Sequence, residues 1–218
     1  MEWQDDALVL GLASFSEWQQ RLIVFTPERG LASGLFRFSS KQPRPIPGSE
    51  IRVTWRGRLA EQLGQFTCEP LRPLNGEIFF DKNALEATQE ILSLLRQHLA
   101  DNLPMPVLFD KTVAFLRALG RESQAPGLFL QWKMMFLAEL GFGLDLERCA
   151  VTGTTENLVY ISPRTGRAVS AGAGAAYAHR LLPFPEALRP TASLTHCWRA
   201  AQHSALTIDF FIKKNISR

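Results

Sequence analysis

The chain has 218 residues, of which 46% are hydrophobic and 21% are charged, and its formal net charge is +3. This length fits one large domain or two small ones, and the plentiful apolar residues exclude a chain that is disordered over most of its length. The longest apolar run covers residues 7–13, far short of the roughly 18 residues that a membrane span needs, so no membrane partner is expected.

The N-terminus and the cysteines predict a cytoplasmic protein. Glu2, Asp5 and Asp6 stand where a signal peptide would carry positive charge. The three cysteines are widely spaced and form no CxxC pair, which indicates neither a disulfide framework nor a standard zinc site. We expect isolated buried thiols at all three positions, which are Cys68, Cys149 and Cys197.

The charges are unevenly distributed along the chain. The net charge is +1 over residues 1–73, −4 over residues 74–147 and +6 over residues 148–218. Residues 29–58 hold seven basic side chains against Glu50 alone, namely Arg29, Arg37, Lys41, Arg44, Arg52, Arg56 and Arg58. Two basic regions separated by an acidic one favour a polyanionic partner.

The first 73 residues predict β-structure. Short runs rich in β-branched and aromatic residues are separated by turn residues and predict strands over residues 6–14, 18–26, 31–39, 50–57 and 65–71. Within the fourth run, Ile51, Val53 and Trp55 alternate with polar side chains, which is typical of a strand with one buried face. Five short strands in about 70 residues suggest a small closed or partly closed barrel.

The remainder of the chain predicts mostly helices, which makes the fold class α+β. Asp81 is a suitable N-cap for a helix over residues 81–99. Two further helices are expected over residues 107–119, stopped by Gly120, and over residues 126–140, as in a helical bundle. The turn-rich stretch 149–170 has a possible strand at 158–161, and helical patterns resume over residues 174–182, 185–188 and 192–214.

The basic segment on the predicted barrel is the best functional signal. Alternation places Arg52 and Arg56 opposite Trp55, and Arg37 opposite Phe36 and Phe38. Cations outside a barrel make a groove that can follow a phosphate backbone. The candidate DNA contacts are Arg37, Lys41, Arg44, Arg52, Arg56 and Arg58. A solvated charged face is an equally good interpretation, whereas the three rings are better explained as core than as base-stacking platforms.

No catalytic pattern stands out, so we expect a protein that is not an enzyme. The chain has no phosphate-binding GxxxxGK[ST] loop and no HExxH pair, and Ser170 lacks the first glycine of a nucleophile elbow. His196 and His203 lie seven residues apart, whereas metal ligands on one helix usually lie three or four apart. No metal role is therefore expected for them.

Several segments, in order, resemble the RecO family of bacterial DNA repair proteins. The N-terminal part of the resemblance comprises Asp6-Ala7-Leu8-Val9-Leu10, Ile23-Val24-Phe25-Thr26, Gly30, Ser39-Ser40-Lys41 and Pro47-Gly48. The most specific part is Leu140-Gly141-Phe142-Gly143-Leu144 followed by Cys149-Ala150 and Thr152-Gly153. Further matches are Leu158-Val159-Tyr160-Ile161-Ser162-Pro163, Gly166-Arg167-Ala168-Val169-Ser170 and Arg180-Leu181-Leu182-Pro183.

The resemblance implies a fold and a function. It implies an oligonucleotide-binding (OB) barrel over residues 1–76 and a helical domain over residues 77–218, with a small inserted element at about 147–172. RecO proteins bind single- and double-stranded DNA, anneal complementary strands and, with RecR, help to load RecA onto DNA coated by single-stranded DNA-binding protein (SSB). The alternative is a protein-binding adaptor whose OB-like barrel does not contact DNA.

The resemblance also implies an SSB partner, whose acidic and hydrophobic C-terminal tail needs an apolar slot edged by cations. The candidate residues are Arg117, Arg121, Trp132, Lys133 and Phe136, although the apolar ones are better explained as core. Zinc-bearing members use two CxxC pairs, whereas here Thr152 follows Cys149 and no second pair exists. The inserted element is therefore expected to be metal-free, with no cofactor.

Overall fold

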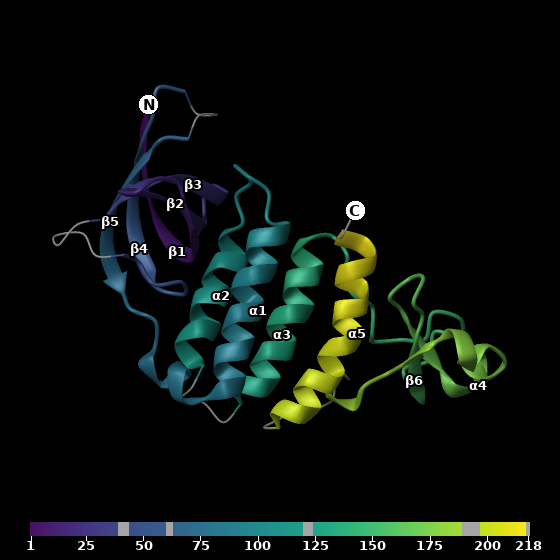
Figure 1. Cartoon of the computed structure of the whole chain (residues 1–218). Coiled ribbons are helices and arrows are strands. Elements are labelled where there is room, and N and C mark those ends of the chain that lie inside the picture. The colour runs from purple at the N-terminus through teal and green to yellow at the C-terminus, as the bar shows by residue number, and fades with distance from the viewer. Residues whose placement is uncertain (39–43, 60–62, 120–123, 189–196, 217–218) are drawn as a thin grey trace. The chain divides into compact units, whose positions relative to one another are not determined.

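The structure is a computed structural model that describes residues 1–38, 44–59, 63–119, 124–188 and 197–216. The chain forms two compact units, Met1–Glu122 and Ser123–Arg218, and each is described by itself. The first unit contains the strands of the N-terminal sheet and two helices, and the second contains two long helices and a small three-stranded sheet (Figure 1).

Five strands of the first unit close into a barrel. They are β1 (Glu2–Ser14), β2 (Gln19–Thr26), β3 (Gly30–Arg37), β4 (Glu50–Arg56) and β5 (Gln65–Arg72). The strand order is β1-β2-β3-β5-β4, with β4 returning to β1; all pairs are antiparallel except β3 with β5, which is parallel. This confirms the predicted number of strands and the closed five-stranded layout expected of an OB-type barrel.

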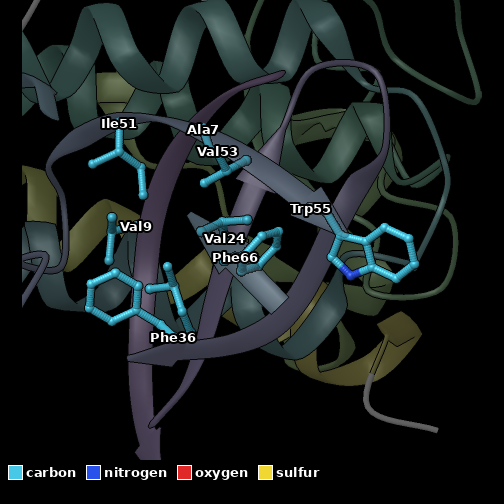
Figure 2. Close-up of a cluster of buried hydrophobic side chains, with 9 residues drawn as sticks. Ala7, Val9, Val24, Phe36, Ile51, Val53, Trp55 and Phe66 are labelled. Carbon is cyan, nitrogen blue, oxygen red and sulfur yellow. The ribbon is translucent and has the colours of Figure 1, made fainter. Parts of the chain in front are cut away.

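The barrel interior is filled by the alternate residues of each strand. Figure 2 shows this cluster, which includes Val9, Phe36, Val53, Trp55 and Phe66, all 4% exposed or less. The side chain at every second position points inward, as the predicted period of two requires. On β4 the positions between the core residues carry Arg52, Thr54 and Arg56, so the alternation there places both arginines in solvent.

The turn between β2 and β3 depends on a glycine. Gly30 has a φ of +60°, and a Cβ at this position would lie 2.5 Å from the carbonyl oxygen of Leu103. Only glycine combines this left-handed backbone with so close an approach of another segment. The turn expected between the strands predicted at residues 18–26 and 31–39 is therefore confirmed, and it brings the barrel against the chain between the first two helices.

The helices of the first unit follow the barrel directly. They are the 3-10 helix η1 (Gly76–Phe80), α1 (Lys82–His98) and α2 (Pro106–Ala118). The Asp81 carboxylate accepts hydrogen bonds from the backbone N–H groups of Asn83 and Ala84, which confirms the predicted N-cap of α1. The expected stop at Gly120 lies outside the described residues.

The first compact unit contains α1 and α2 as well as the barrel, because both helices contact its strands. The sequence placed a domain boundary after residue 76, where strands give way to helices. The change in secondary structure and the change in packing thus fall at different points of the chain, and the boundary at residue 76 stays a prediction.

The second unit begins with α3 (Ala125–Glu139) and ends with α5 (Trp198–Ile216), and these two helices pack on each other. Between them lie β6 (Leu158–Ile161), β7 (Ala168–Ser170) and β8 (Leu182–Pro183), which form a sheet in the order β7-β6-β8. The predicted strand at 158–161 is confirmed. The predicted start of the last helix, residues 192–196, lies outside the described residues.

One predicted helix of the second unit is wrong in kind. Residues 174–182 were expected to be helical, but only the single turn α4 (Ala171–Gly174) and the 3-10 helix η2 (Ala175–Arg180) form before β8, and the stretch predicted at 185–188 is the 3-10 helix η3 (Glu186–Leu188). Gly172 and Gly174 lower the helix propensity here, and residues 175–180 bury no side chain that could hold a longer helix in place.

No helix in the described part of the chain is both long and apolar enough to cross a membrane.

Candidate nucleic-acid interface

The arginines predicted to line the barrel do lie on its outside. Arg37 at the end of β3, Arg52 and Arg56 on β4, and Arg58 just after β4 are all exposed. Arg44 is exposed in the segment before β4. Lys41, the sixth predicted contact, lies outside the described residues. The outward position of the arginines on the strands confirms the alternation, whereas their role in DNA binding stays a prediction.

Two of these arginines are engaged by carboxylates of the neighbouring strand. Arg52 donates to Asp6 at 2.8 Å and Arg56 donates to Glu2 at 2.9 Å, because β1 and β4 align these residues in register. The hydrogen bond to Asp6 raises the pKa of Arg52, and the hydrogen bond to Glu2 raises the pKa of Arg56. The outer β1–β4 face is therefore largely neutralised within the protein itself.

Arg37, Arg44 and Arg58 are different, because none of the described carboxylates forms an ion pair with them. The guanidinium of Arg44 stacks over the ring of Phe38 at 4.1 Å, a cation–π contact that fixes its position without cancelling its charge. Arginine charges without a carboxylate partner are the ones that remain available to an external anion.

The aromatic rings named in the sequence analysis are mostly interior. Phe36 is fully buried and Trp55 is 3% exposed, which confirms that they are core residues and removes them as base-stacking platforms. Phe38 is partly buried beneath Arg44. The exposed rings of the barrel are elsewhere: Phe15 and Trp18 stand in the turn between β1 and β2. Alternation along strands could not identify these two rings, because they lie in a turn. The sequence signal that could have found them is two aromatic residues within a short polar turn.

Arg117 forms part of a carboxylate-centred cluster in the first unit. Its Nε donates to Glu50 at 2.8 Å, and Arg72 approaches the same carboxylate at 4.0 Å. The hydrogen bond to Glu50 raises the pKa of Arg117. These three residues border a cavity together with Leu74 and Asn75. Arg117 is thus committed to an internal partner rather than presented as an isolated cation.

The other predicted SSB-tail residues lie mainly in the interior of the second unit. Trp132 and Phe136 stack with ring centroids 5.2 Å apart and are 3% and 0% exposed. Lys133 is fully buried, forms an ion pair with Asp209 of α5 and contacts the ring of Phe129. Arg121 lies outside the described residues. The structure brings three of the five side chains together as core, and tail binding at these residues stays a prediction.

The inserted element contains Cys149, a buried cysteine with hydrogen-bonding partners. The backbone N–H of Ser170 donates to Cys149 Sγ at 3.3 Å. Burial raises the pKa of the Cys149 thiol, but hydrogen bonds from Ser170 and Thr152 outweigh it and bring the pKa to about 6. No cluster of three or more His, Cys, Asp or Glu occurs among the described residues, and the donors around Cys149 do not fit a zinc ion. A metal-free element stays a prediction.

The other cysteines differ from the expectation. Cys68 is partly buried, and burial raises its pKa to about 12, which leaves it as an unreactive thiol. Cys197 is exposed, so the prediction that all three thiols are buried is wrong there. It immediately precedes α5, and its carbonyl oxygen accepts a hydrogen bond from the backbone N–H of Ala201.

Comparison with known proteins gives one consistent result. Residues 80–206 match the family model described as "Recombination protein O C terminal". The chain is 38% identical over 192 residues to a "DNA repair protein RecO" of Ruegeria sp. (strain TM1040), covering 87% of this chain and 80% of that protein. Identity is 41% over 203 residues for the protein of that name in Methylorubrum extorquens (strain PA1), covering 91% and 82%. It is 35% over 220 residues for that of Anaplasma marginale (strain St. Maries), covering 99% and 92%.

Proposed function

We propose that this chain, which belongs to the RecO family of DNA repair proteins, binds single- and double-stranded DNA without sequence preference and anneals complementary strands. Family membership gives the role in DNA repair and recombination. The proposal adds direct DNA binding by the barrel, partnership with RecR in loading RecA onto SSB-coated strands, and a mediating rather than catalytic role at the nucleoid in the cytoplasm.

The observation that carries the proposal is the set of exposed arginines that have no carboxylate partner among the described residues: Arg37, Arg44 and Arg58. A guanidinium matches a phosphate in charge and in hydrogen-bonding geometry. Contacts to the backbone carry no base information, so such a surface binds DNA of any sequence. A repair protein benefits from this property, because gaps and breaks have no fixed sequence.

Annealing follows from the same contacts. Two complementary strands repel each other through their phosphates, and a cationic surface that holds one strand lowers this repulsion for the second. The bases stay free to pair as long as the protein holds only the backbone. The same cations attract the acidic SSB tail, which gives a physical reason for SSB as a partner, although the predicted tail residues that the structure describes, Arg117, Trp132, Lys133 and Phe136, make internal contacts.

Salt-dependent binding to a labelled oligo-dT strand tests the proposal. Each phosphate contact to a single strand contributes about −0.7 to the slope of log K against log salt, so three contacts give a slope near −2. Recruitment of Arg52 and Arg56 away from Asp6 and Glu2 would bring it to about −3.5. Binding of both strand forms at low salt, with faster annealing of complementary strands, is the expected result.

Failure to bind either form of DNA at about 50 mM salt, where phosphate contacts are strongest, would refute the proposal. If the protein still bound RecR under those conditions, the barrel would act as the protein-binding adaptor that the sequence left as the alternative.

A further inference from the structure

A cavity opens at the end of the barrel where β3 and β5 separate. These two strands pair only at Leu35 with Gln65 and at Phe36 with Phe66. Beyond that point β5 continues beside β4 as far as Arg72, and among the described strands none pairs with its other edge there. The space between this edge and the segment that precedes β4 is a cavity of about 360 Å³.

The unpaired edge of β5 offers backbone hydrogen-bonding groups. The N–H of Leu35 donates to the carbonyl oxygen of Gly64 at 2.7 Å, so Gly64 and the even-numbered residues of β5 that follow it direct their backbone groups toward β3. By the same period of two, Cys68 directs its N–H and C=O, and Pro70 its C=O, to the side of the cavity that both residues line. A proline, which has no N–H, is tolerated at an edge position of this kind. The edge can therefore accept two hydrogen bonds and donate one.

The walls of the cavity are mostly apolar. Phe36 and Ile51, which are both buried, form its inner wall, and they lie on the side of the barrel core away from Trp55 (Figure 2). Ile46 borders the cavity nearer to solvent and is 54% exposed. Apolar cavities at the mouth of a barrel, with a few polar groups around them, are typical binding sites. This cavity suits an apolar side chain.

Two arginines with spare charge also line the cavity, namely Arg44 and Arg72. Arg44 forms no ion pair with a carboxylate of the described residues. Arg72 comes only to 4.0 Å from the carboxylate of Glu50, which accepts two hydrogen bonds from Arg117. The two guanidinium groups therefore favour a ligand that carries a carboxylate beside its apolar side chain.

We propose that this cavity binds an extended acidic segment of a partner protein, which adds to the free edge of β5 as a short strand, inserts an apolar side chain between Ile46 and Phe36, and places carboxylates at Arg44 and Arg72. Strand addition to a sheet edge takes its affinity from main-chain hydrogen bonds and its specificity from pockets for alternate side chains. A nucleic acid has no N–H and C=O groups in strand register to match this edge. The inference goes beyond the proposed DNA binding, because it assigns the β5 end of the barrel to a protein partner.

The test uses a synthetic peptide that is blocked at both ends and in which glutamate and valine alternate, and it measures the binding of this peptide to the full chain by fluorescence polarisation. The same peptide with glutamine in place of glutamate tests the role of charge. The same peptide with N-methylated amides tests the backbone hydrogen bonds, because it keeps the side chains and loses the N–H donors. Each change should weaken binding about tenfold.

Variants of the chain place the peptide at the cavity. Ile46→Asp puts a carboxylate at the opening and should weaken binding of the glutamate peptide at least about tenfold. Leu59→Asp is the matched control, because Leu59 is an apolar residue of similar exposure (52%) that lies after β4 and does not line the cavity; unchanged binding is expected. Arg72→Ala should weaken binding of the glutamate peptide and leave that of the glutamine peptide nearly unchanged. Thermal unfolding of each variant checks that the barrel is intact.

Several outcomes would overturn this inference. No binding of the glutamate–valine peptide up to about 1 mM is one, and equal binding of its N-methylated form is another, because it would show that no strand is added. Equal losses for Ile46→Asp and Leu59→Asp would show that the peptide does not occupy the cavity. A dimer of the free protein that Ile46→Asp abolishes would assign the cavity to a second copy of the chain. None of these measurements involves DNA, so this inference and the proposed function can fail separately.

Discussion

Arg37 and Arg52 offer a direct test of whether ion pairing within the protein decides which arginines bind DNA. Both are exposed on the outside of the barrel, but Arg52 is paired with Asp6 and Arg37 has no carboxylate partner among the described residues. We expect Arg37→Ala to weaken the binding of a single strand and to flatten its salt dependence, and Arg52→Ala to leave the salt dependence unchanged.

The magnitude follows from counterion release. One phosphate contact to a single strand contributes about 0.7 to the slope of log K against log salt. At about 0.1 M salt, one decade below the 1 M reference, the loss of that contact lowers affinity by about 0.7 log units, or about fivefold. Arg37→Ala should show both changes. Arg52→Ala uncovers Asp6, whose charge is screened over about 8 Å at physiological salt, so only a small loss of affinity is expected.

Fluorescence polarisation of a labelled oligo-dT at several salt concentrations from about 50 to about 200 mM measures the slope and the affinity together. Asp6→Asn completes the set, because it releases Arg52 from its partner without removing the cation. If the strand avoids the β1–β4 face, this variant keeps the slope of the unmodified protein. Equal slopes for Arg37→Ala and Arg52→Ala, or a steeper slope for Asp6→Asn, would refute the reasoning that the paired face is not used.

Three further predictions concern the scaffold. Asp209→Asn should lower the free energy of unfolding by about 3–5 kcal/mol, because it removes the carboxylate that pairs with the buried Lys133 ammonium. Lys133→Met should cost less, since the Asp209 side chain is 29% exposed. Equal losses in urea unfolding would contradict this. The pKa of Cys149 is lowered to about 6 from 9.0, so the contribution of its thiolate to stability is complete above pH 9, declines as the pH falls and is lost below pH 6. The difference in unfolding free energy between the unmodified protein and Cys149→Ser should therefore grow from pH 6 to pH 9. A difference that does not change with pH would argue against a thiolate. Asp81→Ala should lower the free energy of unfolding by about 1 kcal/mol, because it removes the N-cap of α1. Asp81→Asn should lower it little, because the Asn side chain can still accept the cap hydrogen bonds. Equal losses for the two variants in thermal unfolding would show that the cap hydrogen bonds contribute nothing.

The barrel was predictable from the sequence because its signals are local. The alternation of Ile51, Val53 and Trp55 with Arg52 and Arg56 is a property of seven consecutive residues, Glu50–Arg56, and one buried face is enough to fix it. The same holds for Asp81, whose capping role depends only on the residues that follow it. The ranges of the second to fifth strands, the N-cap and the outward arginines therefore agree with the structure closely, whereas β1 begins at Glu2 and not at the predicted residue 6.

The charge balance of the candidate site was not predictable in the same way. Arg52 meets Asp6 only because β1 lies beside β4, and the alternation within one strand says nothing about which strand is its neighbour. Lys133 is similar: its helix is apolar on several sides, but the partner that allows the lysine to be buried, Asp209, comes from the last helix of the chain. Pairings between distant segments decide which charges are free, and they follow from topology.

This distinction bears on how a single surface could both bind a strand and let it anneal. A strand held by stacking along its whole length would have its bases occupied, and pairing with a complement would have to displace them. Among the described barrel residues the exposed large rings, Phe15 and Trp18, are confined to the β1–β2 turn, whereas the β2–β3 face offers Arg21 and Arg37, whose guanidinium groups suit phosphates. Bases over the cationic face stay available, so pairing can begin there and release the stacked bases afterwards. Trp18→Ala should therefore leave the annealing rate at saturating protein nearly unchanged, and a large loss of that rate would show that bases held at the turn initiate pairing.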